Sequence, residues 1–179
     1  MGKQMKGAFF LNFRDRSDLR IRSITQNDAE DLRVWKNNNR NSFFYKQEIL
    51  PEEQAKWYHN YLLREDDYIF IVEVLNNDTW EKIGCLGFRV VEGNIDLYNV
   101  IRGRITEARS SMREAMHILL AYISARYSYP IKCDVLVDNP AVEWYNKCGF
   151  SIKECRGDYY IMVFDKDMVT LPDVDEEEI

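Results

Sequence analysis

The sequence predicts a single mixed α/β domain in which about seven strands form one mixed sheet flanked by four helices. Apolar segments with the period of a strand alternate with segments of helical period along most of the 179 residues. A long amphipathic helix also separates three consecutive strands from a short strand–helix–strand unit near the C-terminus. The hydrophobic share of 46% is enough to build a core in a chain of single-domain length.

The first third of the chain is expected to hold one strand and two helices. Residues 19–24 alternate between apolar and polar side chains, as in a half-buried strand. Asp28 would lie at the positive end of the dipole of a helix over residues 28–37. Pro51 suits the first turn of a second helix, in which apolar side chains recur at helical spacing.

The remaining strands are expected in the middle and at the end of the chain. Residues 68–75, 82–91 and 94–102 have the pattern of three strands separated by turn residues. Apolar side chains at i, i+3 and i+4 from Met112 to Tyr127 predict a long helix. The last predicted elements are a strand at 131–137, a helix at 141–147, and strands at 150–154 and 159–164.

The two ends of the chain lie outside this pattern. Residues 1–17 are expected to form an N-terminal extension, in which residues 7–13 could add an edge strand, and the domain itself covers residues 18–167. Residues 168–179 form an acidic tail that is expected to fray in solvent. The tail carries five of the net −6 charges, which leaves the rest near −1. A body this close to neutral gives no electrostatic reason to expect nucleic-acid binding.

Several classes of protein are not favoured by the composition. Apolar runs such as residues 68–72 are too short to span a bilayer, and no signal peptide is recognisable, so we expect a cytoplasmic protein that binds no membrane. Without a C-x-x-C pair or a His/Cys cluster, no metal site is predicted. The cysteines at positions 85, 133, 148 and 155 are predicted to be reduced and buried. The oligomeric state stays open, with a homodimer as one option.

A motif near the C-terminus carries the strongest functional signal. The predicted strand at 131–137 runs into residues 139–150, NPAVEWYNKCGF, which combine an amphipathic helix with a Gly-Phe corner. The spacing of Asn139, Ala141 and Tyr145 before this corner closely resembles the C-terminal motif of the GNAT superfamily of N-acetyltransferases. The order of strands and helices over residues 19–165 also resembles the layout of that superfamily.

The resemblance implies that acetyl-CoA is the acyl donor and serves as a co-substrate. Asn139, Ala141 and Tyr145 would then lie beside its pantetheine and sulfur. Tyr145 would act as a general acid that protonates the departing thiolate. Without the resemblance, Tyr145 is equally well explained as a core tyrosine and Asn139 as a helix cap.

The predicted pyrophosphate site departs from the family pattern. Superfamily members usually carry the loop R/Q-x-x-G-x-G/A at the start of the long helix, and its amides hold the pyrophosphate. The corresponding residues here are Arg109, Ser110, Ser111, Met112 and Arg113. Ser110 and Met112 stand where glycines are expected. The helix N-terminus and the two arginines still predict an anion site, and a plain helix start with exposed arginines is the alternative.

The strand at 94–102 corresponds by resemblance to the central strand of the superfamily. In relatives this strand splays from the strand after the long helix, and pantetheine enters the gap. The residues whose backbone groups are expected to bond pantetheine and the thioester carbonyl are Asn99, Val100, Ile101 and Gly103. Gly103 could instead be only a turn residue.

The resemblance also indicates residues on the acceptor side. Asp96 lies where many relatives carry a strand acid that activates the amine through water, and Glu73 on the neighbouring strand is the second choice. The first two helices are expected to cover the acceptor, in a pattern similar to relatives that acetylate ribosomal-protein N-termini or nucleotide-linked amino sugars. The residues of this pattern are Trp35, Arg40, Phe43, Gln54 and Trp57. Each of them is also explained by ordinary packing.

The function that the resemblance implies is acetyl transfer from acetyl-CoA to a primary amine by direct attack. The acceptor would be an amino sugar or a protein amine. No cysteine or serine stands in a nucleophilic arrangement with a histidine, so no covalent enzyme intermediate is expected. Two alternatives stay open. One is a non-catalytic module that binds CoA, favoured by the missing glycines, and the other is an acyltransferase that uses a different acyl thioester.

Overall fold

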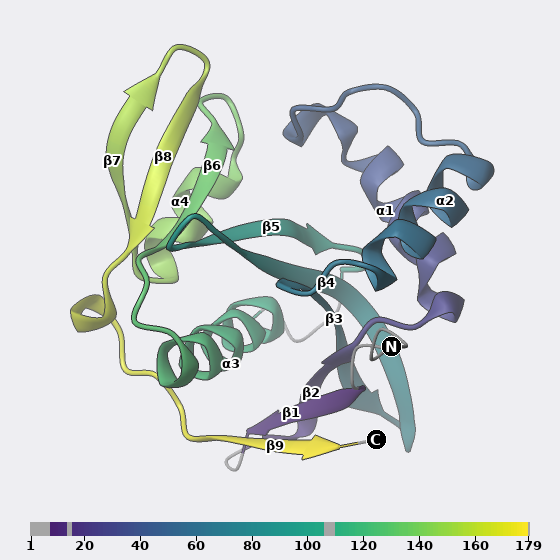
Figure 1. Ribbon diagram of the computed structural model, residues 1–179. Helices are drawn as coiled ribbons and strands as arrows, with labels where there is room; N and C mark the ends of the chain where they lie inside the picture. The colour runs from purple at the N-terminus through teal and green to yellow at the C-terminus, as the bar shows by residue number, and fades with distance from the viewer. Residues whose placement is uncertain (1–7, 14–15, 106–109, 179) are drawn as a thin grey trace, which may run out of the picture.

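The computed structural model describes residues 8–13, 16–105 and 110–178 of the chain. Its helices are α1 (Ala29–Asn38), α2 (Pro51–Leu62), α3 (Ser111–Arg126) and α4 (Ala141–Lys147). Its strands are β1 (Phe9–Phe13), β2 (Arg16–Ser23), β3 (Asp67–Asn76), β4 (Thr79–Val91), β5 (Asn94–Arg102), β6 (Ile131–Leu136), β7 (Phe150–Arg156), β8 (Tyr159–Phe164) and β9 (Val174–Glu178). The strands form one sheet in the order β7-β8-β6-β5-β4-β3-β2-β1-β9 (Figure 1).

The predicted fold class is confirmed, and each predicted strand and helix is present within a few residues of its expected ends. The described residues contain nine strands rather than about seven, because β1 and β9 extend the sheet beyond β2. All neighbouring strands in the described sheet are antiparallel except β5 and β6. This exception determines where the functional cavity lies.

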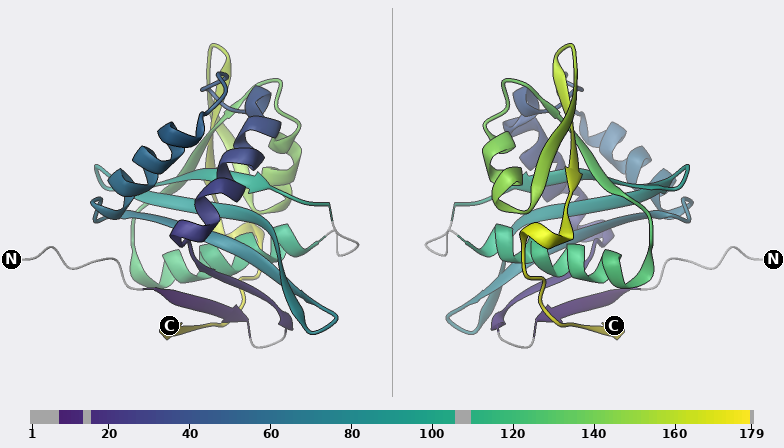
Figure 2. Two further views of the ribbon diagram at one scale, coloured as in Figure 1. Left: turned by 90° about the vertical axis from the view of Figure 1, so that its right-hand side faces the viewer. Right: turned by 90° about the vertical axis from the view of Figure 1, so that its left-hand side faces the viewer.

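Helices cover both faces of the central strands. Figure 2 shows α3 on one side of the sheet and α1 and α2 on the other. Along β3, Phe70 and Val72 pack into the core under α3, whereas Ile69 and Ile71 pack into the core under α1 and α2. Successive side chains of a strand point to opposite faces, so a strand covered on both sides becomes a continuous apolar run.

The C-terminal tail is ordered as a strand, so the prediction that it frays is wrong for Val174–Glu178. It pairs antiparallel with β1, which the sequence had suggested as an edge strand. The side-chain amide of Asn12 donates a hydrogen bond to Glu177 at 3.0 Å, and Arg126 forms an ion pair with Glu176. β1 would otherwise expose unpaired backbone groups. A charged strand satisfies those groups and discourages further pairing.

The cysteine prediction needs one correction. All four cysteines are free, and those at 85, 133 and 148 are buried, but Cys155 is exposed. Cys155 lies on the edge strand β7, where Phe150 is the one buried residue. No helix in the described part of the chain is long and apolar enough to cross a membrane. Within the same residues, no group of three His, Cys, Asp or Glu side chains is arranged to hold a metal ion.

Candidate active site

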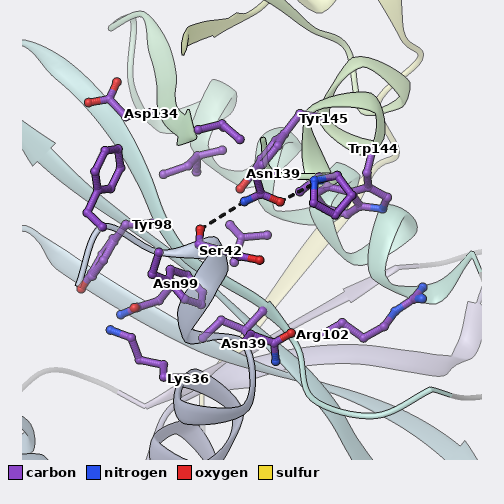
Figure 3. A pocket seen from close by; sticks show the side chains of 18 of the residues that line it. Lys36, Asn39, Ser42, Tyr98, Asn99, Arg102, Asp134, Asn139, Trp144 and Tyr145 are labelled. Carbon is purple, nitrogen blue, oxygen red and sulfur yellow. Dashed lines mark hydrogen bonds between the residues drawn. The ribbon is translucent and has the colours of Figure 1, made fainter. Parts of the chain in front are cut away.

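The two central strands β5 and β6 separate, and a cavity opens between them. Their parallel pairing is confined to Ile95 with Ile131 and Asp96 with Lys132. Beyond these pairs, a cavity of about 650 Å³ is lined by β5, β6, α4 and the segment that follows α1 (Figure 3). The residues predicted to bind the acyl donor that line it are Asn99, Val100, Ile101, Met112, Asn139, Ala141 and Tyr145.

A β-bulge interrupts β5 where it borders the cavity. Asn99 and Val100 together face a single residue of β4, Leu86, and neither takes part in the ladder. Asn99 has a φ of 50°, in the left-handed region that asparagine tolerates better than most residues. The thiol of Cys85 donates a hydrogen bond to the carbonyl oxygen of Asn99 at 3.0 Å and helps to hold this conformation. The bulge therefore leaves the backbone groups of Asn99 and Val100 beside the cavity, where they do not pair with β4 in the ladder.

Asn139 joins two walls of the cavity. Its side-chain oxygen accepts a hydrogen bond from the N–H of Ala141, the first residue of α4, at 2.9 Å. Its side-chain nitrogen donates to the carbonyl oxygen of Ser42, in the segment after α1, at 3.1 Å (Figure 3). The capping role expected for asparagine at a helix start is therefore present, and the same side chain ties α4 to the opposite wall.

Tyr145 extends from α4 into the lining of the cavity (Figure 3). Its ring packs edge-to-face on Trp144 and Phe150, with centroid distances of 5.2 and 5.5 Å. Burial, together with the nearby Cys133 and other acidic groups, raises the pKa of Tyr145 well above its ordinary value. The phenol is thus protonated at neutral pH, and it makes no hydrogen bond to any residue that the structure describes. Tyr145 is available as a proton donor.

A second tyrosine in the cavity is committed to the protein. The hydroxyl of Tyr98 donates a hydrogen bond to the buried carboxylate of Asp67. Burial and this carboxylate raise the pKa of Tyr98 far above its ordinary value. Tyr98 therefore fixes the shape of the wall, whereas Tyr145 keeps its proton for a ligand.

Two carboxylates line the cavity on neighbouring strands, Asp96 on β5 and Asp134 on β6. Asp96 is paired with Lys132 across the ladder, and side chains two residues apart on a strand share a face, so Asp134 lies on the same face as Asp96. Asp96 also forms an ion pair with Arg89 at 2.8 Å. Partial burial and the charge of Asp96 raise the pKa of Asp134 above its ordinary value.

Met112 forms part of the cavity wall at a position where the family pattern has glycine. Its side chain is buried and lies over Gly84 on β4, where an added β-carbon would come within 2.9 Å of the methionine sulfur. Gly84 therefore makes the space that Met112 needs. The bulk at the start of α3 is accommodated by a glycine on the sheet.

The rest of the predicted pyrophosphate site does not reach the cavity. Ser110, Ser111 and Arg113 are absent from its lining. The carbonyl oxygen of Ser110 accepts from the N–H of Arg113 at 2.9 Å, as expected at a helix start. Ser111 is fully buried, and its hydroxyl has no hydrogen-bond partner among the described residues. Arg109 lies outside the described residues, so the pyrophosphate site stays a prediction.

Gly103 and Trp35 contact each other rather than the cavity, which corrects both predictions. A β-carbon at Gly103 would come within 2.2 Å of the Trp35 ring. Trp35 is buried in the core between the sheet and the helices α1 and α2. The glycine is therefore explained by close packing of an aromatic side chain, not by the approach of a ligand.

Glu73 is also remote from the cavity lining, so its predicted role toward the acceptor is corrected. Its two carboxylate oxygens accept hydrogen bonds from Arg20 at 2.8 Å and from Arg22 at 2.9 Å. Glu73 is only 4% exposed. Its charge is neutralised by two guanidinium groups, which leaves no accessible base.

The remaining acceptor predictions divide between two cavities. Phe43 lines the main cavity. Gln54 and Trp57 line a second cavity of about 180 Å³ between α1 and α2. Arg40, in the short turn after α1, is exposed and lines neither cavity, because the chain there points it to solvent. The pattern taken from relatives thus places one of five residues at the main cavity.

Sequence reasoning missed four charged residues of the lining, Lys36, Arg89, Arg102 and Asp134. Lys36 follows Trp35 directly and lines both cavities. The helical phase that buries Trp35 could have indicated it. Asp134 occupies an outward position in the alternation of β6, and the register of the parallel pair is needed to place it beside Asp96. Uncharged lining residues that were missed include Asn39, Tyr98 and Trp144.

Comparisons with known proteins agree with this geometry. Among solved structures, a domain from Methanocaldococcus jannaschii DSM 2661 superimposes with a TM-score of 0.71 at 21% identity, over 92% of this chain and 100% of that one. FdhC, a nucleotide-linked sugar GNAT, gives a TM-score of 0.70 at 19% identity, over 84% of this chain and 88% of that one.

A third similar structure is spermidine N-acetyltransferase from Vibrio cholerae in complex with CoA and spermine, with a TM-score of 0.63 at 20% identity, over 83% of this chain and 94% of that one. No sequence match was found among curated proteins. The model of the acetyltransferase (GNAT) domain family matches residues 18–151. Since this match covers most of the chain, and the splayed strands and bulged β5 accompany it, the chain belongs to the GNAT acetyltransferase family.

Proposed function

We propose that this protein is an N-acetyltransferase that moves an acetyl group from acetyl-CoA to a primary amine, either an amino sugar or a protein amine. The observation that carries the proposal is the cavity between β5 and β6, which has the bulge at Asn99 on one wall and Tyr145 on another. These are the two chemical elements that acyl transfer from a thioester needs, a site for the carbonyl and a proton donor for sulfur.

The lining fits the pantetheine end of the donor. Pantetheine carries amides, and the bulge at Asn99 and Val100 offers backbone groups that the ladder does not use. Ala141 and Met112 supply apolar surface beside them. Acetyl-CoA would supply an acyl carbon activated by its bond to sulfur. The backbone N–H groups of the bulge would polarise the acyl carbonyl, as fixed donors in a partly dry site do most effectively.

The side chains of the cavity would move two protons. The Asp96 and Asp134 carboxylates would take one proton from the acceptor ammonium, directly or through water, which leaves a neutral amine to attack the acyl carbon. As the new C–N bond forms and the C–S bond breaks, Tyr145 would give its phenolic proton to the departing sulfur. The raised pKa of Tyr145 keeps that proton in place beforehand.

Direct attack is favoured over a route through an acylated cysteine. Burial raises the pKa of Cys85 to about 12 and that of Cys148 to about 12, and it raises the pKa of Cys133 well above its ordinary value. Thiols in this state are poor nucleophiles, because the thiolate is the reactive form. Neither Cys85 nor Cys133 nor Cys148 lines the main cavity.

A thiol-release assay with acetyl-CoA and a panel of primary amines tests the proposal, with the N-acetylated product identified by mass spectrometry. We expect one thiol released per amide formed. Met112 in place of a glycine favours the alternative of a non-catalytic module, so CoA affinity should be measured by calorimetry in parallel. CoA binding without an amide product from any amine would replace the proposal by that alternative. Faster turnover with a longer acyl thioester would instead identify that thioester, rather than acetyl-CoA, as the acyl donor.

A further inference from the structure

We propose that the small cavity between α1 and α2 binds an anionic group of the acceptor, held by the ammonium of Lys36 and the side-chain amide of Gln54. The inference rests on the proposed function and narrows its substrate class. The acceptor would be a primary amine that also carries an oxyanion, either a carboxylate or a phosphate. The amine would react in the main cavity while the oxyanion occupies the small one.

Lys36 is a charged group without an opposite charge. It lies in the last turn of α1 and lines the main cavity (Figure 3). It lines the small cavity as well. Beyond a cation–π contact with the ring of Phe43 at 5.7 Å, it makes no ion pair or hydrogen bond with any residue that the structure describes. Burial lowers the pKa of Lys36 below its ordinary value. The negative end of the α1 dipole offsets only part of this cost, so an anionic ligand would complete the site.

The same helix shows that this fold pairs its other buried charges. At the start of α1, Asp28 accepts hydrogen bonds from Arg22 at 2.7 and 3.0 Å and pairs with Lys82 at 2.7 Å. Lys82 also pairs with Asp31 at 2.8 Å. A lysine that reaches this helix from β4 is therefore given carboxylate partners within the protein. Lys36 has none, which points to a partner from outside the chain.

Gln54 supplies a second donor to the same cavity. The residue is 4% exposed, and its side-chain nitrogen is buried without a hydrogen-bond partner among the described residues. The carboxylate that lines this cavity, Glu53, already accepts the N–H of Leu50 at 2.8 Å at the start of α2. Two donors without a hydrogen-bond partner among the described residues, one of them cationic, are an arrangement that suits an oxyanion.

The dimensions and the charge distribution agree with a two-part acceptor. A cavity of about 180 Å³ has room for a carboxylate or a phosphate, since a water molecule takes about 30 Å³ of liquid volume. The main cavity also holds Asp96 and Asp134, which would attract the acceptor ammonium. A polyamine, by contrast, would bring a second positive charge toward Lys36.

Matched pairs of acceptors test the inference, with acetyl-CoA as donor and kcat/KM as the readout. One arm compares ω-amino acids of increasing length with alkylamines of the same length. The other compares aminoalkyl phosphates with the corresponding amino alcohols. We expect the wild-type protein to prefer the anionic member of at least one arm by about 10- to 100-fold, the range of charge-assisted hydrogen bonds. The arm that shows the larger preference identifies carboxylate or phosphate.

Variants assign the preference to its residues. Lys36→Met should remove most of the preference, measured as the ratio of kcat/KM for the anionic and the neutral member of a pair, and Lys36→Arg should retain part of it. Gln54→Leu should cause a smaller loss, and the two losses should not add in the double variant, because both donors would act on one group. Lys56→Met, which removes an exposed lysine of α2, is the matched control and should change nothing.

Calorimetry with the N-acetylated products, in the presence of CoA, provides a readout that does not need turnover. Anionic products should bind the wild-type protein more tightly than neutral products, and Lys36→Met should abolish the difference. Equal use of anionic, neutral and cationic amines by the wild type would overturn the inference and leave the proposed function intact. If no amine reacts, the proposed function fails. The inference then stands or falls on whether anionic products bind and depend on Lys36.

Discussion

The two ends of α1 differ in whether a buried charge has a partner within the protein. At its start, Asp28 is 1% exposed and is surrounded by Arg22 and Lys82. Near its end, Lys36 lies against a cavity without a carboxylate partner among the described residues. The two sites are on one helix and in one layer of the fold, so a general tolerance of buried charge does not explain the difference.

This difference separates groups that stabilise the fold from groups that are available to a ligand. The network of Arg20, Arg22, Asp28, Glu73 and Lys82 satisfies its own charges and gives a ligand nothing to bind. The cavity contains a protonated Tyr145 and an unpaired Lys36. These groups lower the stability of the fold and are useful only when a substrate binds them. Each of the following predictions changes one side of the comparison, from the largest expected effect to the smallest.

The largest effect is expected for Asp28, at the start of α1. Asp28→Asn should lower the free energy of unfolding by about 3 kcal/mol, because it leaves buried cations without their carboxylate. Asp31→Asn, at a carboxylate that is 42% exposed, is the matched control and should cost well below about 1 kcal/mol. Urea denaturation measures both. A loss for Asp28→Asn no greater than that of the control would show that the network does not stabilise the fold.

The pH dependence of stability sharpens the same point. Burial alone would raise the pKa of Asp28, but hydrogen bonds from Arg22 and Lys82 outweigh it and lower the pKa below its ordinary value. The stabilisation by Asp28 should therefore be complete above pH about 4, near the unfolded-state pKa. It should be lost as the pH falls further toward the folded-state pKa. Urea denaturation at several pH values across that range should show that the free energy of unfolding of Asp28→Asn depends less on pH than that of the wild type.

A smaller effect is expected at the carboxylates of the cavity. The ionised form of Asp134 accepts a proton, and its pKa is raised, so kcat/KM should fall as the pH drops through that pKa. Asp134→Asn should remove this acidic limb and lower the plateau by about 10-fold, since Asp96 remains. Asp96→Asn is the companion variant. If the limb persists in Asp134→Asn and disappears in Asp96→Asn, Asp96 is the base, and a limb in both would assign the proton to water.

The smallest effect is expected from Lys36→Met, and its sign is opposite to that of Asp28→Asn. Removing an unpaired ammonium should raise the free energy of unfolding at neutral pH by about 1 kcal/mol. Because the folded-state pKa of Lys36 is lowered, the unfolded chain binds more protons between that pKa and about 10.4. Wild-type stability should rise with pH across this window, and the methionine variant should lack this rise. A destabilised variant would mean that Lys36 has a structural partner.

Much of the fold and of the donor side of the site follows from local sequence. Periodicity predicts every helix and seven strands, and the spacing of Asn139 and Tyr145 fixes where α4 meets the cavity. The acidic strand β9 could not be predicted, because its charged residues have no strand propensity and gain order only from the free edge of β1.

The acceptor side was less predictable for a related reason. Gly103 and Trp35 are far apart in sequence, and only their contact shows that each serves the packing of the other. Glu73 resembles a candidate base until Arg20 and Arg22 are placed on it. Donor-side residues are held by one short helix and one strand, whereas acceptor-side roles depend on which distant side chains meet.

Tyr145→Phe gives the most direct test that the cavity between β5 and β6 is an acetyl-transfer site. The variant keeps the ring and its contacts with Trp144 and Phe150, so CoA affinity and the free energy of unfolding should change by no more than about 1 kcal/mol. Loss of the proton donor should lower kcat for thiol release by about 100-fold, the low end for general acid catalysis, since a thiolate is a tolerable leaving group. Turnover within about twofold of wild type would show that the Tyr145 hydroxyl does not protonate the sulfur.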